Sequence, residues 1–138
     1  MTGKAITQVE VGFSASFTRT VTEEDIRKFA EVSSDFNPLH HDQEYARRTI
    51  FGERIAHGIL VLGPVSTALT RLPGVVVYLS QNARFLRPVK IGDAIEAVVQ
   101  VTERVQERSE VSLKTVCRNQ RGEQVLEGEA RVKLLDLR

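Results

Sequence analysis

The chain has 138 residues, of which 41% are hydrophobic and 27% are charged, and its formal net charge is +1. This composition is typical of one globular domain over residues 1–138, and the near-neutral charge argues against nucleic acid or an anionic membrane as a main partner. The lone cysteine, Cys117, excludes an internal disulfide and a cysteine-based zinc site. No apolar run reaches the ~20 residues that span a bilayer, and the first residues lack a signal-peptide core, so we expect a cytoplasmic protein.

The first elements in chain order are a strand and a helix. Apolar and polar side chains alternate over residues 13–21, which predicts a strand. Thr22 is a favourable N-cap for a helix that ends near Ser33 or Ser34, and Val21 and Ile26 occupy the two positions of a hydrophobic staple. Asp42 is expected to cap a second, short helix that begins at residue 43.

The segment "ILVLGPVSTALTRL", residues 59–72, is apolar on nearly all sides, which predicts a helix buried on most of its surface. Pro64 lies inside this segment. Proline donates no backbone hydrogen bond and clashes within a regular helix, so we expect a kink or a late helix start there. The "LPG" of residues 72–74 is expected to end the helix.

The second half of the chain predicts four strands, over residues 75–86, 94–103, 110–118 and 125–134. In the last three, apolar and polar side chains alternate, which is typical of a sheet with one covered face. Short connections such as "NQRG" favour antiparallel hairpins. Together with one buried helix, these strands predict an α+β fold in which an antiparallel sheet of about five strands wraps the helix.

The stretch "DFNPLHHD", residues 35–42, holds two of the three histidines. The Asn37-Pro38 step breaks the chain direction, so the turn can bring Asp35 and His40 to one side of the loop. A carboxylate and an imidazole in one small volume can act as an acid/base pair. Composition alone favours another interpretation, a turn with a helix-capping aspartate and exposed imidazoles.

The third histidine stands in "RIAHGIL", where His57-Gly58 precedes the predicted buried helix. The first amides of a helix have no internal partner and attract negative charge, so this point can supply an oxyanion hole to Asp35 and His40. The alternative is that His57 only anchors the loop.

Taken together, "DFNPLHHD", "FGERIAHGIL" and "FLRPVKIGD" closely resemble the MaoC-like (R)-specific enoyl-CoA hydratases, which have the hot-dog fold. The resemblance extends from about Phe13 to Leu134. It implies reversible syn addition of water to trans-2-enoyl-CoA, giving (R)-3-hydroxyacyl-CoA. It also implies that Asp35 and His40 are the catalytic pair and that the Gly58 N–H binds the thioester oxygen.

The same resemblance implies supporting roles for other residues. Asn37 would shape the catalytic loop, His57 would support it, and Ser66 would lie near the aspartate. The surroundings of Ser66, "GPVSTA", lack the second glycine of a nucleophile elbow, which argues against a serine hydrolase. Arg84 and Arg87 are candidate contacts for the CoA phosphates, with ordinary surface arginines as the alternative. We expect no cofactor and no metal, and the family implies a homodimer or higher homo-oligomer with its edge strands paired.

Four other interpretations stay open. The chain can be a 3-hydroxyacyl-thioester dehydratase acting on acyl carrier protein, an acyl-CoA thioesterase in which Asp35 activates water against the carbonyl, or a non-catalytic acyl-thioester module. A metal site from His40, His41 and Asp42 is disfavoured, because adjacent histidines rarely converge on one ion. We expect His41 to face solvent and Cys117 to lie in the core.

Overall fold

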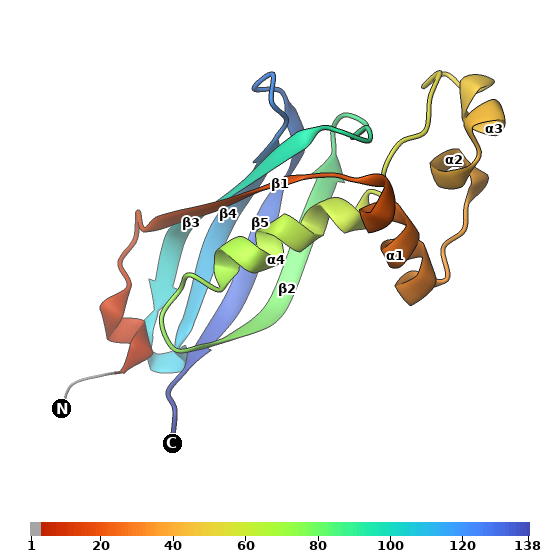
Figure 1. Cartoon of the computed structure of the whole chain (residues 1–138). Coiled ribbons are helices and arrows are strands. Elements are labelled where there is room, and N and C mark those ends of the chain that lie inside the picture. Colours follow the sequence, from red (N-terminus) through yellow and green to blue (C-terminus); the bar gives the residue numbers. More distant parts are fainter. Residues whose placement is uncertain (1–3) are drawn as a thin grey trace.

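The computed structural model describes residues 4–138 and contains one antiparallel sheet of five strands (Figure 1). The strands lie in the order β1-β3-β4-β5-β2. Their bounds are Ser14–Thr20 for β1, Val75–Phe85 for β2, Ala94–Val105 for β3, Glu110–Arg118 for β4 and Gln124–Leu135 for β5. All five predicted strands are confirmed, and each neighbouring pair is antiparallel.

The sheet curves around helix α4, Leu62–Leu69, which crosses its inner face (Figure 1). The inward side chains of α4, such as Val65 and Ala68, have no exposed surface, and neither do Leu113 and Leu126 of the sheet. Burial alternates along β3, as the period of two predicts, whereas β4 also buries Ser112 and Val116 on its other face, so the predicted polar face is interrupted there. The predicted sheet-wrapped helix is therefore confirmed.

The helix begins late and ends early. A short 3-10 helix, η2 (Ile59–Val61), precedes α4, so Pro64 falls in the first turn of α4, where its missing N–H has no intrahelical partner to lose. The prediction of a late start is confirmed. The predicted end at residues 72–74 is wrong, because the amides of residues 70–72 bond carbonyls three residues back and tighten the chain into turns after Leu69.

The lone cysteine lies on the inner face of β4. Cys117 is fully buried, as predicted, and its Sγ lies 3.9 Å from the carbonyl oxygen of Val61. Burial raises the pKa of the thiol to about 12. A thiol with such a pKa is protonated at neutral pH and is part of the core rather than a nucleophile.

Three helices project beyond one end of the sheet (Figure 1). They are α1 (Glu23–Ser33), α2 (Pro38–His41) and α3 (Gln43–Arg47), and we call residues 22–50 the helical segment. Thr22 caps α1 in a capping box with Asp25, and Asp42 accepts a hydrogen bond from the Tyr45 amide at 3.0 Å. Both predicted caps are confirmed. Two more 3-10 helices, η1 (Ala5–Gln8) and η3 (Gln106–Arg108), lie outside this segment. No helix within residues 4–138 is long and apolar enough to cross a bilayer.

Candidate active site

The loop between α1 and α2 is built from two successive Asx turns. The Asp35 carboxylate accepts a hydrogen bond from the main-chain N–H of Asn37 at 3.1 Å. The Asn37 side-chain oxygen accepts one from the main-chain N–H of Leu39, also at 3.1 Å. Asn37 is thereby the N-cap of α2, and Pro38 takes the first helical position, where proline is favoured. The "DFNPLH" sequence thus fixes the path from Asp35 to His40 through local bonds.

His40 is held in one tautomer. The residue is 7% exposed, and its Nδ1 lies 2.7 Å from the carbonyl oxygen of Ile55. A carbonyl oxygen can only accept a hydrogen bond, so Nδ1 carries the proton. In the neutral ring, Nε2 therefore bears the lone pair and is free to accept a proton.

His57 lies against His40 and fastens the loop. It is 2% exposed, its ring centroid is 3.9 Å from that of His40, and its Nε2 donates a hydrogen bond to the main-chain oxygen of Asp35 at 3.0 Å. Burial lowers the pKa of His57 and favours the neutral ring. Its Nδ1 is then a buried acceptor without a hydrogen-bond partner in residues 4–138.

The three side chains converge. A carboxylate oxygen of Asp35 and one ring nitrogen each of His40 and His57 all lie within 4.8 Å of one another, with Asp35 exposed to solvent. The predicted convergence of Asp35 and His40 is confirmed. The group is a cluster of one exposed acid and two buried imidazoles, which suits proton transfer.

The same three groups are also of the type that binds metals. However, an imidazole lone pair lies in the plane of its ring, and the rings of His40 and His57 are stacked with their planes 33° apart. Each ring also uses one nitrogen in a hydrogen bond to a main-chain oxygen, Nδ1 of His40 with Ile55 and Nε2 of His57 with Asp35. The absence of a metal at this cluster stays a prediction.

His41 is not where the sequence predicted it. It is half-buried, its Nε2 is buried without a hydrogen-bond partner in the described residues, and its ring centroid lies 5.7 Å from those of Phe36 and His57. The prediction that His41 faces solvent is wrong, because the single turn of α2 packs this ring beneath Phe36. The group of converging ligand atoms contains neither His41 nor Asp42.

A cavity of about 310 Å³ adjoins the cluster. His40 and Gly58 line it together with mostly apolar side chains, among them Phe51, Phe85 and Leu86. An apolar cavity with a few polar groups in its wall is the usual form of a small-molecule site. A second cavity, of about 380 Å³, lies between α1, β1 and α4, and Val61 lines both.

Gly58 precedes η2 in the wall of the first cavity, and its glycine identity has a spatial reason. Its φ of −55° is available to any residue, but a Cβ at this position would lie 3.1 Å from two ring carbons of Phe85. The Gly58 N–H makes no hydrogen bond to the described residues 4–138. It is therefore free to bind an oxygen in the cavity.

Comparison with known proteins identifies the family. The MaoC like domain matches residues 5–123 of the chain. The chain belongs to the MaoC-like domain family. An (R)-specific enoyl-CoA hydratase of Rhodospirillum rubrum is 45% identical over 126 residues, which are 90% of this chain and 87% of that protein. A 3-hydroxybutyryl-CoA dehydratase of Methylorubrum extorquens is 43% identical and covers 91% of this chain and 81% of its own length.

A solved structure of an R-hydratase has the same fold as this chain. The R-hydratase PhaJ1 from Pseudomonas aeruginosa, in its unliganded form, superposes with a TM-score of 0.87 at 40% identity, covering 96% of this chain and 86% of that one. The sheet-wrapped helix is the hot-dog fold, as the sequence predicted. The family match leaves the predicted 1–138 boundaries untested, and residues 1–3 lie outside the described part of the chain.

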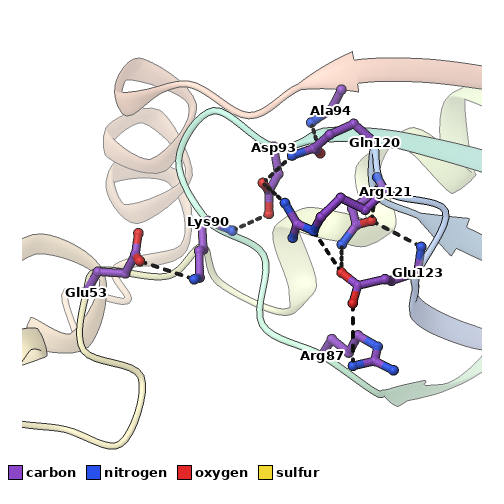
Figure 2. Close-up of polar contacts among 9 residues, drawn as sticks. Glu53, Arg87, Lys90, Asp93, Ala94, Gln120, Arg121 and Glu123 are labelled. Atoms are coloured by element: carbon purple, nitrogen blue, oxygen red, sulfur yellow. Dashed lines mark hydrogen bonds and ion pairs between the residues drawn. The ribbon is translucent and has the colours of Figure 1, made fainter.

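The structure separates the two arginines that were candidate phosphate contacts. Arg84 lies 3.0 Å from the Glu127 carboxylate and does not line the cavity. Arg87 does line it, and its guanidinium lies 3.8 Å from Glu123. Figure 2 shows Arg87 and Arg121 approaching Glu123 from opposite sides, within a chain of ion pairs that continues to Asp93. Of the two, only Arg87 lines the cavity, and its contact with a phosphate stays a prediction.

Ser66 lies apart from the converging cluster. It is exposed on α4 and faces a groove that Tyr78 and Leu79 of β2 also line. No hydrogen bond in residues 4–138 joins it to Asp35, so its supporting role stays a prediction.

Two contacts of His40 were missed by sequence reasoning. The Ile55 carbonyl holds the His40 ring, and the Arg54 Nε–H donates to the His40 main-chain oxygen at 2.8 Å. Both residues stand in "FGERIAHGIL", but a main-chain carbonyl leaves no mark on a side-chain pattern, and a lone arginine in a loop indicates a surface residue by default.

Proposed function

We propose that this chain catalyses the reversible hydration of trans-2-enoyl-CoA to (R)-3-hydroxyacyl-CoA. The observation that carries the proposal is the convergence of the Asp35 carboxylate with His40 beside the cavity that Gly58 also lines. The names of the relatives, an (R)-specific enoyl-CoA hydratase and a 3-hydroxybutyryl-CoA dehydratase, support the two directions of this one reaction.

The substrate's own chemistry defines what the site must do. In a trans-2-enoyl thioester, the carbonyl withdraws electron density from C3, so the oxygen of water adds there. Negative charge then develops on the thioester oxygen. The free Gly58 N–H, in a largely apolar cavity, is the group that we propose stabilises it.

Proton transfer falls to the other two residues. Asp35, as a carboxylate, takes a proton from the attacking water while the C3–O bond forms, and His40 delivers a proton to C2. Because Nδ1 bonds the Ile55 carbonyl, the delivered proton sits on Nε2. The pair begins as carboxylate and imidazolium and ends as carboxylic acid and neutral imidazole, and proton exchange with solvent restores it. Dehydration runs the same steps in reverse.

Supporting residues act by geometry in this proposal. Asn37 keeps the turn between Asp35 and His40, and His57 holds the Asp35 main chain through its Nε2. Both proton-transferring groups approach from one side of the substrate, which gives syn addition. The proposed supporting role of Ser66 rests on the family resemblance alone.

The proposed substrate is an acyl thioester of CoA, with acyl carrier protein as the alternative carrier. Arg87 is the proposed phosphate contact, since it lines the cavity. Its guanidinium lies 3.8 Å from the Glu123 carboxylate, and a phosphate can replace so long an ion pair. Arg84 is the weaker candidate because its closer partner, Glu127, holds it outside the cavity wall. We propose no cofactor.

We also propose a homodimer, in a single-domain cytoplasmic protein spanning residues 1–138. Strand β2 is an end strand of the sheet, so one side of it is not paired in the described chain. Val75, Val77, Tyr78 and Leu79 of this strand are all exposed. A second copy that pairs with β2 would cover both its backbone groups and these side chains. The mass of the protein in solution, measured by light scattering, tests this part.

The deciding experiment follows enoyl absorbance and free thiol in parallel, with crotonyl-, octenoyl- and longer enoyl-CoA esters. Loss of enoyl absorbance without thiol release, and a product of (R) configuration, are expected. Thiol release would instead identify a thioesterase. Ligand binding without turnover would identify a binding module, and an (S) product would overturn the proposed geometry.

A further inference from the structure

We propose that Arg54 is a positioning residue, which holds His40 with its Nε2 directed at the reacting atoms by bonding the His40 main chain. This inference rests on the proposed function, since it concerns the residue that delivers the proton. Arg54 itself does not line the cavity and reaches it only through its hydrogen bond to His40.

Two consecutive residues, Arg54 and Ile55, bond to His40, one at its main chain and the other at its ring. The Arg54 Nε–H donates to the His40 carbonyl oxygen at 2.8 Å, and the Ile55 carbonyl oxygen accepts from the His40 ring at 2.7 Å. The first bond fixes the backbone of His40, and the second fixes its ring and tautomer. If the backbone shifts, the ring must leave the Ile55 carbonyl, so the two bonds depend on each other.

His40 needs such external support because α2 is only the four residues Pro38–His41. A single helical turn is not stable on its own, since its nucleation costs more than its few hydrogen bonds return. Asn37 secures the beginning of α2, and Arg54 secures its end. A bond to the carbonyl of His40 therefore limits the motion of the whole turn.

The arginine is itself held in place. Its two terminal nitrogens lie 2.5 and 3.1 Å from the carboxylate oxygens of Glu23, the first residue of α1, and its side chain is only 15% exposed. The guanidinium fork allows Arg54 to bind Glu23 and the His40 carbonyl at once, which the single ammonium of lysine does less well. Arg54 thus ties α1 to the end of α2.

Ile55, the second of these two residues, belongs to a segment that is bonded to residues 89 and 90. Ile55 pairs with Lys90 in an isolated bridge, and the Ala56 amide donates to the Val89 carbonyl at 2.7 Å. Lys90 in turn pairs with Glu53 at 3.1 Å, which Figure 2 shows at the edge of the polar network. Residues 53–56 therefore connect His40 to the segment before β3 and fix its position relative to that segment.

The test uses four variants and an assay of hydration. Arg54→Met should lower kcat about 10- to 100-fold with little change in KM, because a displacement of about 1 Å at a reacting group has effects of this size. Arg54→Lys should recover only part of the loss. Glu23→Gln keeps the Arg54 N–H that donates to His40, so its kcat should fall less than that of Arg54→Met. Arg47→Met is the matched control, since Arg47 pairs with Glu44 on α3 and does not touch His40.

A second measurement does not depend on activity. The ¹⁵N chemical shifts of the histidine rings report which nitrogen carries the proton, and neutral His40 should be the Nδ1–H tautomer in the native chain and a mixture in Arg54→Met. Kinetic effects are read only on variants that melt cooperatively, with Arg54→Lys as the second variant should Arg54→Met not fold. An unchanged kcat and tautomer in a folded Arg54 variant would overturn the inference. A native chain with no hydratase activity but with the tautomer shift in Arg54→Met would overturn the proposed function and leave Arg54 as a positioning residue of His40.

Discussion

The sheet with α4 and the helical segment are held together in different ways. In the sheet, side chains such as Ile95, Val99 and Leu113 have no exposed surface and pack around α4. In residues 22–50, the only fully or nearly fully buried hydrophobic side chains are Ile26, Ala30 and Ala46, and the segment depends on hydrogen bonds between side chains and backbone.

This difference separates stability from the proposed chemistry. The core can lose little apolar volume without loss of stability, because close packing leaves no replacement for a missing contact. The loop with Asp35 is exposed and contributes few core contacts, so its functional groups can be changed without unfolding the chain. If the two regions are independent, substitutions in the helical segment should change turnover and substitutions in the core should change stability.

The largest expected effect belongs to the helical segment. Asp35→Asn should lower kcat about 10³-fold, because the amide cannot take a proton from water. The melting temperature should stay near that of the native chain, since Asp35 is exposed and Asn can accept the same hydrogen bond from Asn37. Steady-state hydration of crotonyl-CoA and thermal melting provide the two measurements. Turnover near the native value would remove Asp35 from the mechanism.

The matching change in the core is Leu113→Ala. Leu113 is fully buried on β4, and such a truncation costs about 2–5 kcal/mol in the free energy of unfolding. Urea denaturation measures this loss, and kcat per folded molecule should be unchanged. Lys114→Ala, on the exposed side of the same strand, is the control and should change stability by less than about 0.5 kcal/mol. A large fall in kcat for Leu113→Ala would show that the regions are coupled.

A smaller effect is expected at the start of α1. Thr22→Ala removes the capping-box acceptor and should cost about 1 kcal/mol. If the helical segment opens by itself, native-state hydrogen exchange will show this loss in the α1 amides and not in those of β4. Equal losses in both elements would mean that the segment unfolds only with the core. Thr18→Ala, on the exposed face of β1, serves as the control.

The smallest effect concerns pH. Burial lowers the pKa of His57 below its ordinary value of 6.5, so the unfolded chain binds more protons than the folded one at mildly acidic pH. Stability from the neutral ring is complete above the unfolded pKa and is lost as the pH falls through the folded pKa. The free energy of unfolding should therefore decline more steeply below pH 6.5 in the native chain than in His57→Gln. Parallel curves for the two proteins would contradict this assignment.

Much of the core could be predicted because its signal is periodic. Alternation in residues such as Ile95, Ala97 and Val99 specifies both a strand and its buried face, and the structure confirms each of these positions. Local rules were equally informative at Thr22, Asp42 and Pro64, where one residue's own chemistry determines a cap or a helix start.

The site was harder to predict because its decisive bonds join residues far apart in sequence. The contact of the His40 ring with the Ile55 carbonyl spans 15 residues, and that of His57 with the Asp35 carbonyl spans 22. Main-chain acceptors have no residue type, so no motif records them. The burial of His41 was missed for a related reason, since it depends on how α2 packs beneath Phe36 rather than on the polarity of the residue.

The buried Cys117 has a practical consequence for experiments on this molecule. As the lone thiol of the chain, fully buried with a pKa of about 12, it can react with a labelling reagent only when the core opens. The rate of thiol labelling in the absence of denaturant therefore measures the opening of the sheet around α4, without an introduced probe. The native sequence thus provides a site-specific kinetic reporter of the core.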